Sequence, residues 1–399
     1  MARAADQTIS LARLSATRGL FSSATSAIAI VWGYAVFVID NSALATGLID
    51  AAYTLSFAAA STWLSIRNHR LAARTAVVVG GLIAASVLAV TGLVTGLRDY
   101  LWLLLLAVVI GLVTGTNYPA WYSLLRQAGG GDQLVRRIGS YESLRVVAVL
   151  GGTVSAGLIA HIMGVEPTGL LIAGAFAAGS FLALSIPRLA KRDHEVPQQA
   201  RTPGVPDADV ARRVRVLYGL LAVIQLILAP IVAVTPVLAV ESVGGGAAHV
   251  GILAALYGAG GALQFLVTKA ARGAAVHVPV SAVLVLMLAS ATTAVVVDNF
   301  FSAGLLMASF GFGVASIGTL INAEIQSSAP ESERDRRVAT FALVFSLPMA
   351  VGSGLWGLGA DFVTVPALAV IASGLTAALA ALVFLTQWRS QHRHATSGD

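Results

Sequence analysis

The sequence contains no cysteine, which excludes a disulfide, a thiol nucleophile and a thiolate metal site. Charged residues are also scarce: they make up 11% of the 399 residues, whereas a soluble domain has roughly 25%. Hydrophobic residues make up 57% of the chain, and the mean hydropathy is +0.83. This composition excludes an ordinary water-soluble fold and points to a protein of the lipid bilayer.

Apolar runs of about 20 residues recur along the whole chain, and a helix of that length crosses a hydrocarbon core of about 30 Å. Lipid offers no partners to backbone polar groups, so each span is expected to be helical. We predict an all-α membrane protein with twelve transmembrane helices, arranged as two six-helix bundles related by pseudo-two-fold symmetry. The predicted spans are 19–40, 42–65, 74–96, 100–126, 138–163, 167–187, 214–240, 247–268, 276–297, 301–325, 338–360 and 365–387.

Basic residues are distributed unevenly along the chain. Of the 25 Lys and Arg residues, 23 lie in segments that share one side of the membrane if the chain crosses it twelve times. Arg98 lies on the other side and Arg145 lies inside a span. By the positive-inside rule, both termini and the long 188–215 loop are cytoplasmic, as expected for a multi-pass protein of a bacterial inner membrane. Residues 1–18 show no cleavage site after a short apolar core, so the first span is predicted to stay in the protein.

The segment from Pro187 to Arg215 is long, polar and rich in Pro, Gln and Asp, and it separates the first six spans from the last six. We therefore predict an N-terminal bundle in residues 1–187, a cytoplasmic linker in 188–213 and a C-terminal bundle in 214–399. Two local matches support a parallel duplication. The first match joins spans 2 and 8: Gly47 and Tyr53 have the same spacing as Gly251 and Tyr257. The second joins spans 5 and 11: residues 136–141, Gly152 and Gly157 match residues 336–341, Gly352 and Gly357.

This organisation resembles the major facilitator superfamily over nearly the whole chain. Within that superfamily, residues 42–48, 118–125 and 331–338 are similar to the small bacterial exporters that include the enterobactin exporter. The resemblance implies alternating access around a central cavity lined by spans 1, 4, 7 and 10, commonly with proton-coupled export. Two departures stand against standard coupling: the 62–70 loop lacks the family's Asp-Arg pair, and Thr25 lies where these exporters often carry an acidic residue in the first span.

Three charged side chains are predicted to lie within spans, where an ionisable group costs roughly 2.5–3.5 kcal/mol and tends to face a cavity or a partner. Asp50 lies about 12 Å below the outer end of span 2 and is the predicted proton carrier, together with Glu142. Arg145 suits an anionic group of the substrate, because its planar fork pairs with carboxylate or phosphate. A structural pair of Glu142 with Arg145, one turn apart, is the alternative. Their equivalents in the second half are Ala254, Ala342 and Phe345, so the fold does not need these charges twice.

Other candidates for substrate binding are polar or aromatic residues on the spans expected to line the cavity. Pro119 is expected to kink span 4 beside them. Core packing is the alternative role for each aromatic ring. The candidates are Trp32, Tyr34, Asn117, Tyr118, Gln225, Tyr257, Gln264 and Asn322.

No catalytic pair, nucleotide loop or metal-ligand spacing is recognisable, so we expect no enzyme activity, cofactor, metal or nucleic-acid partner. We expect a monomer in the bilayer whose partners are a small-molecule substrate and, as one option, protons. The leading prediction is a secondary transporter that exports a siderophore-like metabolite or an amphiphilic drug. An importer of a small nutrient and a lipid or lysolipid transporter use the same fold, and a receptor without flux is a further alternative.

Overall fold

The computed structural model describes residues 11–66, 73–95, 99–127, 132–186, 208–264, 266–267, 277–296, 299–327 and 334–396, and helices account for nearly all of them. Most of the predicted linker lies outside these ranges. The principal helices are α1 (Leu11–Asp40), α2 (Ala43–Ile66), α3 (Ala73–Val90), α4 (Tyr100–Gln127), α5 (Asp132–Met163), α6 (Val165–Leu184), α7 (Ala208–Ile227), α9 (Ala247–Ala262), α11 (His277–Val296), α12 (Phe300–Ser327), α13 (Arg334–Ala360) and α14 (Val365–Thr396).

The twelve predicted spans are confirmed. Within the described part of the chain, nine helical stretches are long and apolar enough to cross a membrane. Three shorter apolar helices occupy the places of the predicted spans 8, 9 and 12, at Ala247–Ala262, Val280–Ala289 and Val365–Leu379.

The seventh span is broken, although the sequence predicts one continuous helix over 214–240. α7 ends at Ile227, and a short 3-10 turn (η2, Ala229–Val232), a single helical turn (α8, Thr235–Val237) and a π turn (η3, Leu238–Ser242) complete the crossing. Pro230 and Pro236 lie in this region. Because proline has no backbone N–H and its ring clashes with the preceding turn, the two prolines interrupt the helical hydrogen bonds.

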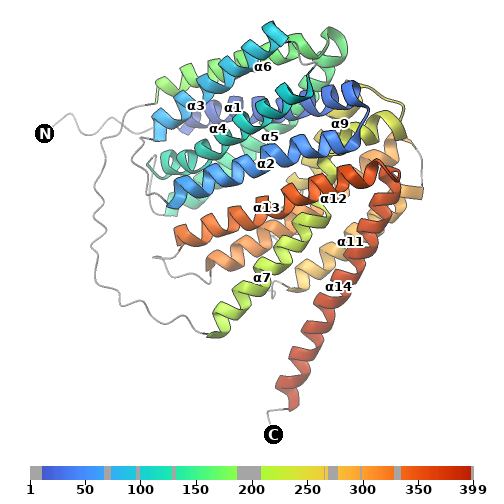
Figure 1. Ribbon diagram of the computed structural model, residues 1–399. Helices are drawn as coiled ribbons and strands as arrows, with labels where there is room; N and C mark the ends of the chain where they lie inside the picture. The colour runs from blue at the N-terminus through green and yellow to red at the C-terminus, as the bar shows by residue number, and fades with distance from the viewer. Residues whose placement is uncertain are drawn as a thin grey trace, which may run out of the picture.

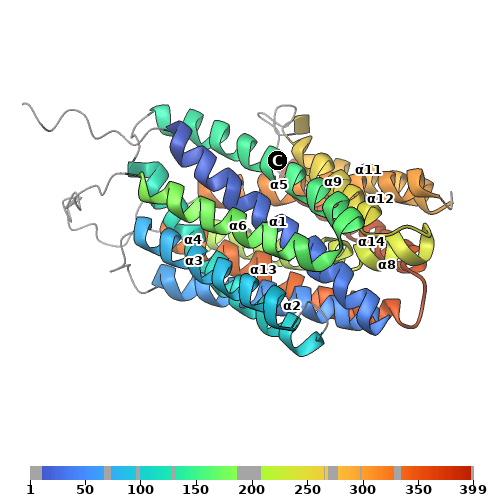
Figure 2. The ribbon, with the colours of Figure 1, turned by 90° about the horizontal axis from the view of Figure 1, so that it is seen from above.

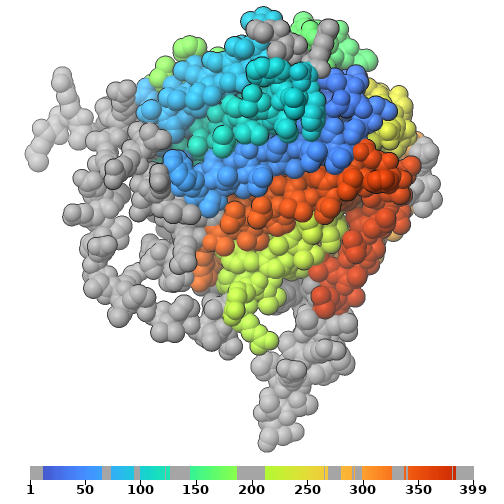
Figure 3. All heavy atoms as spheres, in the orientation of Figure 1, coloured from blue at the N-terminus to red at the C-terminus, as the bar shows by residue number. Residues whose placement is uncertain are grey.

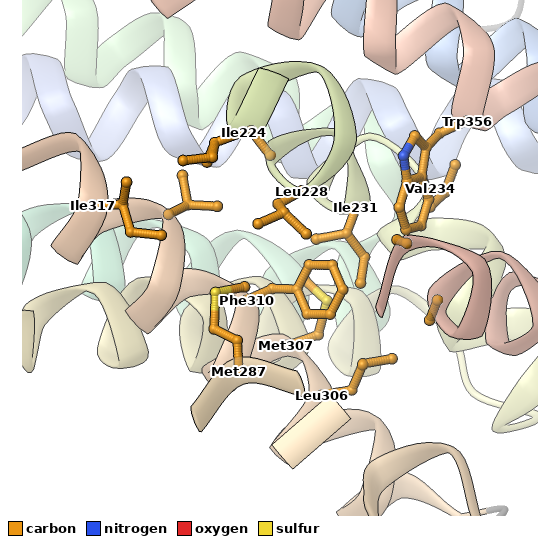
Figure 4. Close-up of a cluster of buried hydrophobic side chains, with 14 of the residues drawn as sticks. Ile224, Leu228, Ile231, Val234, Met287, Leu306, Met307, Phe310, Ile317 and Trp356 are labelled. Carbon is orange, nitrogen blue, oxygen red and sulfur yellow. The ribbon is translucent and has the colours of Figure 1, made fainter. Parts of the chain in front are cut away.

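The helices form two groups that lie side by side in Figure 1, with α1 to α6 in one half and α7 to α14 in the other. Figure 2 looks onto the first half, with α13 of the other half behind it. Each half has its own apolar core. Figure 4 shows the C-terminal core, where Ile224 of α7 and Leu228, directly after α7, pack near Phe310 of α12, and Trp356 contributes from α13. This core also includes Ile30, Phe37 and Ala43 of the N-terminal half, so apolar packing continues across the boundary.

The two ends of the bundle differ in what they hold. The turns at 41–42, 164, 243–246 and 361–364 lie at one end, which we call the turn end. The other end holds the beginning of α1 and the end of α14, and we call it the terminal end. The halves meet mainly along two helix pairs, α2 with α13 and α5 with α9. The first pair is visible in Figure 1 and runs along the surface in Figure 3.

Candidate functional site

The first helix pair between the halves approaches to backbone contact near the turn end. A Cβ atom added at Gly47 of α2 would overlap the carbonyl oxygen of Ser353 and lie 3.0 Å from the Cα atom of Gly357 on α13. A Cβ atom added at Gly357 would lie 2.6 Å from the carbonyl oxygen of Ala43. Only glycine fits at both positions of this α2–α13 crossing, because the atoms in the way are backbone atoms.

The second helix pair repeats this geometry. A Cβ atom added at Gly157 of α5 would lie 2.7 Å from the carbonyl oxygen of Ala247 and 2.8 Å from the Cα atom of Gly251 on α9. A Cβ atom added at Gly251 would lie 2.6 Å from the carbonyl oxygen of Thr153. We call this contact the α5–α9 crossing.

The duplication seen in the sequence relates the two crossings to each other. Gly47 corresponds to Gly251 and Gly357 corresponds to Gly157, so the contact of Gly47 with Gly357 maps onto the contact of Gly251 with Gly157. A two-fold relation between similar units produces this exchange of contacts. The surrounding residues follow the same rule: Ala43 corresponds to Ala247, and Ser353 to Thr153.

One polar contact breaks this symmetry at the α2–α13 crossing. The Ser353 hydroxyl donates a hydrogen bond of 2.7 Å to Oδ2 of the half-buried Asp50, and lies 3.0 Å from the carbonyl oxygen of Met349 on its own helix. Asp50 also interacts electrostatically with Tyr53 of its own half and Tyr257 of the other. The equivalent of Asp50 in the α5–α9 crossing is Ala254, which carries no charge.

A second carboxylate joins the halves at the turn end itself. Asp361, in the turn after α13, accepts hydrogen bonds from the backbone N–H of Ala43 at 2.8 Å and of Leu44 at 3.4 Å, and from the Ser42 hydroxyl at 3.3 Å. These N–H groups belong to the first turn of α2, which has no helical partners for them. The carboxylate therefore caps α2 from the other half, at the helix end where negative charge is favoured.

Aromatic and hydroxyl groups of α1, α2 and α4 meet deeper in the N-terminal half. The rings of Trp32 and Tyr53 pack with centroids 5.6 Å apart, and the hydroxyl groups of Tyr53 and Thr114 lie 3.3 Å apart. Trp32 is only 2% exposed, so in this structure it is part of the N-terminal core.

Further towards the terminal end, the half-buried Arg18 of α1 lies over the ring of Trp121 of α4, 5.4 Å from the ring centre. Its Nε atom is buried without a hydrogen-bond partner, as is Nε1 of Trp121. Asn117, one turn before Trp121, is 2% exposed, and neither its Oδ1 nor its Nδ2 has a partner. Its amide packs at Gly80 of α3, where an added Cβ atom would lie 2.9 Å from Oδ1.

Four other predicted substrate residues are half-buried or hydrogen-bonded. Tyr34 packs against the C-terminal core, and its hydroxyl lies close to Gly246. Tyr118 packs edge-on against Phe57 with ring centroids 5.6 Å apart. Tyr257 is half-buried and packs against the C-terminal core. Gln264 accepts a hydrogen bond from the hydroxyl of Thr319.

The remaining candidates are not brought into one cluster with Asp50. Gln225 is fully buried in α7, and neither polar atom of its amide has a hydrogen-bond partner. Asn322 and Arg145 are half-buried, and each has an interaction partner. The side chain of Glu142 lies outside the described residues, so its predicted pairing with Arg145 stays a prediction.

Sequence reasoning missed Ser353, Asp361 and Arg18. Ser353 has no charge and lies in a glycine-rich stretch that indicates packing. Asp361 follows the last apolar residue of a span, where a carboxylate is ordinary. Arg18 falls at the start of the first span and was grouped with the basic N-terminal segment. The signal that places Arg18 on an interior face is its helical spacing: Arg18, Thr25 and Trp32 follow one another at intervals of seven positions.

Comparison with known proteins agrees with this architecture. The sequence profile of the Major Facilitator Superfamily matches residues 14–353. No curated protein sequence matches the chain. Among solved structures, the nucleoside transporter NupG is 12% identical, with 94% of this chain and 98% of that chain covered and a TM-score of 0.74.

Two further solved structures are similar over a comparable length. A bacterial homologue of the human lysosomal transporter Spinster, inward-facing and unoccupied, is 15% identical, with a TM-score of 0.69 over 94% of this chain and 93% of that chain. A peptide transporter POT in complex with alafosfalin is 15% identical, with a TM-score of 0.70 over 95% and 94%. At these identities the structures establish the fold, while the profile match covers most of the chain. The chain therefore belongs to the Major Facilitator Superfamily of membrane transporters.

Proposed function

We propose that this transporter exports a small amphiphilic organic molecule, such as a siderophore-like metabolite or a drug, by alternating access. The observation that supports this most directly is the pair of symmetry-related glycine crossings, which bring the two halves into backbone contact near the turn end. Two halves that meet through small residues at these two crossings can separate at one end by rocking. The structure would then represent the state in which the turn end is closed.

The orientation follows from the basic residues. The sequence places 23 of the 25 Lys and Arg residues on the same side of the membrane as the beginning of α1 and the end of α14. We therefore take the terminal end to face the cytoplasm, by the positive-inside rule. A closed turn end then separates the interior from the outside. A substrate taken up from the cytoplasm is expelled when the crossings open.

Asp50 is the proposed site of proton coupling. When ionised, its carboxylate accepts the hydrogen bond from Ser353 and holds α2 against α13. Protonation removes the charge that strengthens this bond, and hydrogen bonds to charged groups contribute about 1.5–3 kcal/mol. A proton on Asp50 therefore shifts the equilibrium towards an open turn end, since it has a different affinity for the two states.

The interior chemistry favours an amphiphile over a sugar. The described spans carry few carboxylates, and the half-buried rings of Tyr34 and Tyr257 offer aromatic surface near the boundary between the halves. Tyr118 adds a half-buried ring packed against Phe57 of α2. The similarity of residues 42–48 and 118–125 to small bacterial exporters supports the same substrate class and the outward direction. Import of a nutrient is the second candidate, because the fold does not set direction.

A flux assay tests the proposal. The purified protein is reconstituted into liposomes with a pH gradient of either sign, and movement of a fluorescent amphiphile is followed in both directions. We expect transport from the side of the terminal end to the side of the turn end, driven by protons moving the opposite way. Transport of a sugar or amino acid into the cytoplasmic side would establish an importer, and binding without any flux would establish a receptor.

A further inference from the structure

Arg18 and Trp121 lie at the same depth of the N-terminal half. Arg18 lies 22 residues before the end of α1 at Asp40, and Trp121 lies 21 residues after the start of α4 at Tyr100, so both are ~32–33 Å from the turn end at 1.5 Å per residue. α1 and α4 are in contact in this half. The two side chains therefore lie near the cytoplasmic edge of the membrane in the proposed orientation, inside the bundle and within reach of that side.

Among the described residues, none neutralises the positive charge of Arg18. In the described ranges, no carboxylate pairs with Arg18, and its guanidinium group rests on the face of Trp121. An arginine that merely extended to lipid headgroups would lie on the outside of the bundle. Arg18 is instead half-buried, on the same helical face as the fully buried Leu14.

Arg18, Trp121 and Asn117 together have too few hydrogen-bond acceptors for their buried donors. Three kinds of buried donor have no partner: Nε of Arg18, Nε1 of Trp121 and the amide nitrogen of Asn117. The single unpartnered acceptor among these residues is Oδ1 of Asn117. Asn117 and Trp121 are four residues apart on α4, so their side chains lie on one face about 5–6 Å apart at Cβ. Buried polar groups in native proteins are nearly always paired, so a missing partner is expected here.

We propose that Arg18, Asn117 and Trp121 form a binding site for the carboxylate or phosphate group of an anionic ligand that approaches from the terminal end. A group with two or three acceptor oxygens satisfies the planar guanidinium fork, the indole N–H and the amide nitrogen together. The ring of Trp121 keeps the fork in place, as an aromatic face attracts a guanidinium. Ordered water alone satisfies the hydrogen bonds but leaves the charge of Arg18 without a counterion.

This inference rests on the proposed function in one respect: the anion is taken to be the acidic group of the exported substrate. The charge of this site also acts on a residue near the α2–α13 crossing. Arg18 and Asp50 both interact electrostatically with Tyr53, so neutralising Arg18 with a bound anion changes the surroundings of a residue close to the α2–α13 crossing. The cationic fork thus selects an acidic amphiphile over a neutral or cationic one.

The test is ligand-dependent thermal stability of the full-length protein in nanodiscs of phosphatidylcholine. Benzoate, phenyl phosphate and inorganic phosphate are compared with the neutral benzamide, in wild type, Arg18→Gln and Arg13→Gln. Arg13 is an exposed arginine near the same end of α1, so its variant removes an equal charge without touching the buried donors. We expect the anions to stabilise wild type and Arg13→Gln, with affinity for Arg18→Gln weaker by about tenfold or more.

Trp121→Phe provides a second variant in case Arg18→Gln does not fold. It keeps an aromatic face under Arg18 and removes one N–H, so anion affinity is expected to fall while the melting curve without ligand stays cooperative.

Adding phosphatidylglycerol to the nanodiscs distinguishes the source of the anion. Stabilisation by that lipid, abolished in Arg18→Gln and not displaced by benzoate, assigns the site to a lipid headgroup; stabilisation by benzoate or phenyl phosphate assigns it to a soluble substrate.

Equal anion effects in wild type and Arg18→Gln, or no anion effect in wild type with either lipid, overturn the site. These outcomes are independent of the flux assay. Arg18-dependent binding without flux would leave the site standing and remove the proposed function. Flux that is unchanged by Arg18→Gln, with no anion binding, would leave the transporter standing and remove the site.

Discussion

The α2–α13 and α5–α9 crossings share their backbone geometry and differ in their polar chemistry. Both have two glycines in contact, and the same atoms of equivalent residues limit the approach. Only the α2–α13 crossing has a carboxylate at its centre, where Asp50 meets Ser353, and a carboxylate at its end, where Asp361 caps α2. The corresponding positions in the α5–α9 crossing hold Ala254 and His161.

The difference separates what the fold requires from what function has added. Close packing of the halves is achieved at the α5–α9 crossing without any buried charge, so the glycines are sufficient for it. A charge near the middle of a span is costly and is tolerated where it has a task. The single copy of Asp50 therefore indicates a role in the transport cycle, and the two crossings provide an internal control for testing it.

The largest effect is expected from replacing a crossing glycine. In Gly357→Ala the new Cβ atom meets backbone of α2, which cannot rotate away, so the halves must separate near the turn end. Such overpacking costs about 1–3 kcal/mol. We expect loss of transport and increased accessibility of a cysteine placed at the buried position Thr46, measured by maleimide labelling of Thr46→Cys, which is the sole thiol in this cysteine-free chain.

Gly354→Ala is the matched control on the same helix, because nothing lies within 4 Å of the added Cβ atom. It should leave both transport and labelling unchanged. Equal behaviour of the two variants would show that the α2–α13 contact does not close the turn end in the membrane.

The same substitution in the second crossing tests whether the two are equivalent. Gly157→Ala should expose a cysteine at the buried Val250, the position that corresponds to Thr46, and should reduce transport as Gly357→Ala does. Gly151→Ala on the same helix is the control, since its Cβ atom meets nothing within 4 Å. If Gly157→Ala transports normally, the α5–α9 crossing is a passive contact and the halves do not move as rigid units.

A smaller effect, confined to coupling, is expected from Asp50→Ala, which gives the α2–α13 crossing the chemistry of its counterpart. Packing through the glycines remains, so the protein should fold and bind substrate. The response of transport to an imposed pH gradient should disappear, as measured in proteoliposomes. Ser353→Ala removes the donor and keeps the charge, so it should weaken the closed state and reduce the pH response, because protonation of Asp50 then no longer weakens a bond to α13. A pH response that survives in Asp50→Ala would place proton coupling elsewhere.

The helices were predictable from the sequence because a chain that crosses lipid must satisfy its backbone hydrogen bonds internally, as a helix does. The positions of the basic loops also indicate the number of crossings. The break in the seventh span was harder to predict. Pro230 and Pro236 are visible in the sequence, but transmembrane helices often retain proline, so proline alone does not predict a break. The repeat also gave the equivalence of Gly47 with Gly251. Which glycine meets which across the boundary is a property of tertiary packing, and the sequence pattern alone does not contain it.

The site was only partly predictable for a related reason. Asp50 was identified because a carboxylate in an apolar run is conspicuous. Its partner Ser353 is inconspicuous and lies 303 residues away. Arg145 and Arg18 are equally basic, and only the three-dimensional arrangement shows that Arg18 lies over Trp121, with buried donors of Arg18, Trp121 and Asn117 left without partners. Trp32 is 2% exposed and packs in the N-terminal core in this state, and its substrate contact stays a prediction.

The smallest effect concerns the carboxylate at the turn end. Asp361→Asn keeps an oxygen that accepts from the N–H of Ala43 and removes the charge that favours the first turn of α2. A charge at an exposed helix end contributes about 0.3–1 kcal/mol, so labelling of Thr46→Cys should rise several-fold at most and transport should persist. High salt should weaken the difference from wild type, because it screens an exposed charge.

The reciprocal variant asks whether this end effect can be transferred to the second crossing. His161 corresponds to Asp361 and lies beside Gly246, directly before α9, where His249 of α9 itself accepts from the Gly246 N–H at 3.3 Å. His161→Asp places a carboxylate near the start of α9 and should lower labelling of Val250→Cys by a similar small factor, with the same sensitivity to salt. A decrease in labelling would show that the end carboxylate acts through the helix terminus it faces, whichever half supplies it. Unchanged or increased labelling would mean that His249 already satisfies α9, and that the two crossings are closed by different means at the turn end.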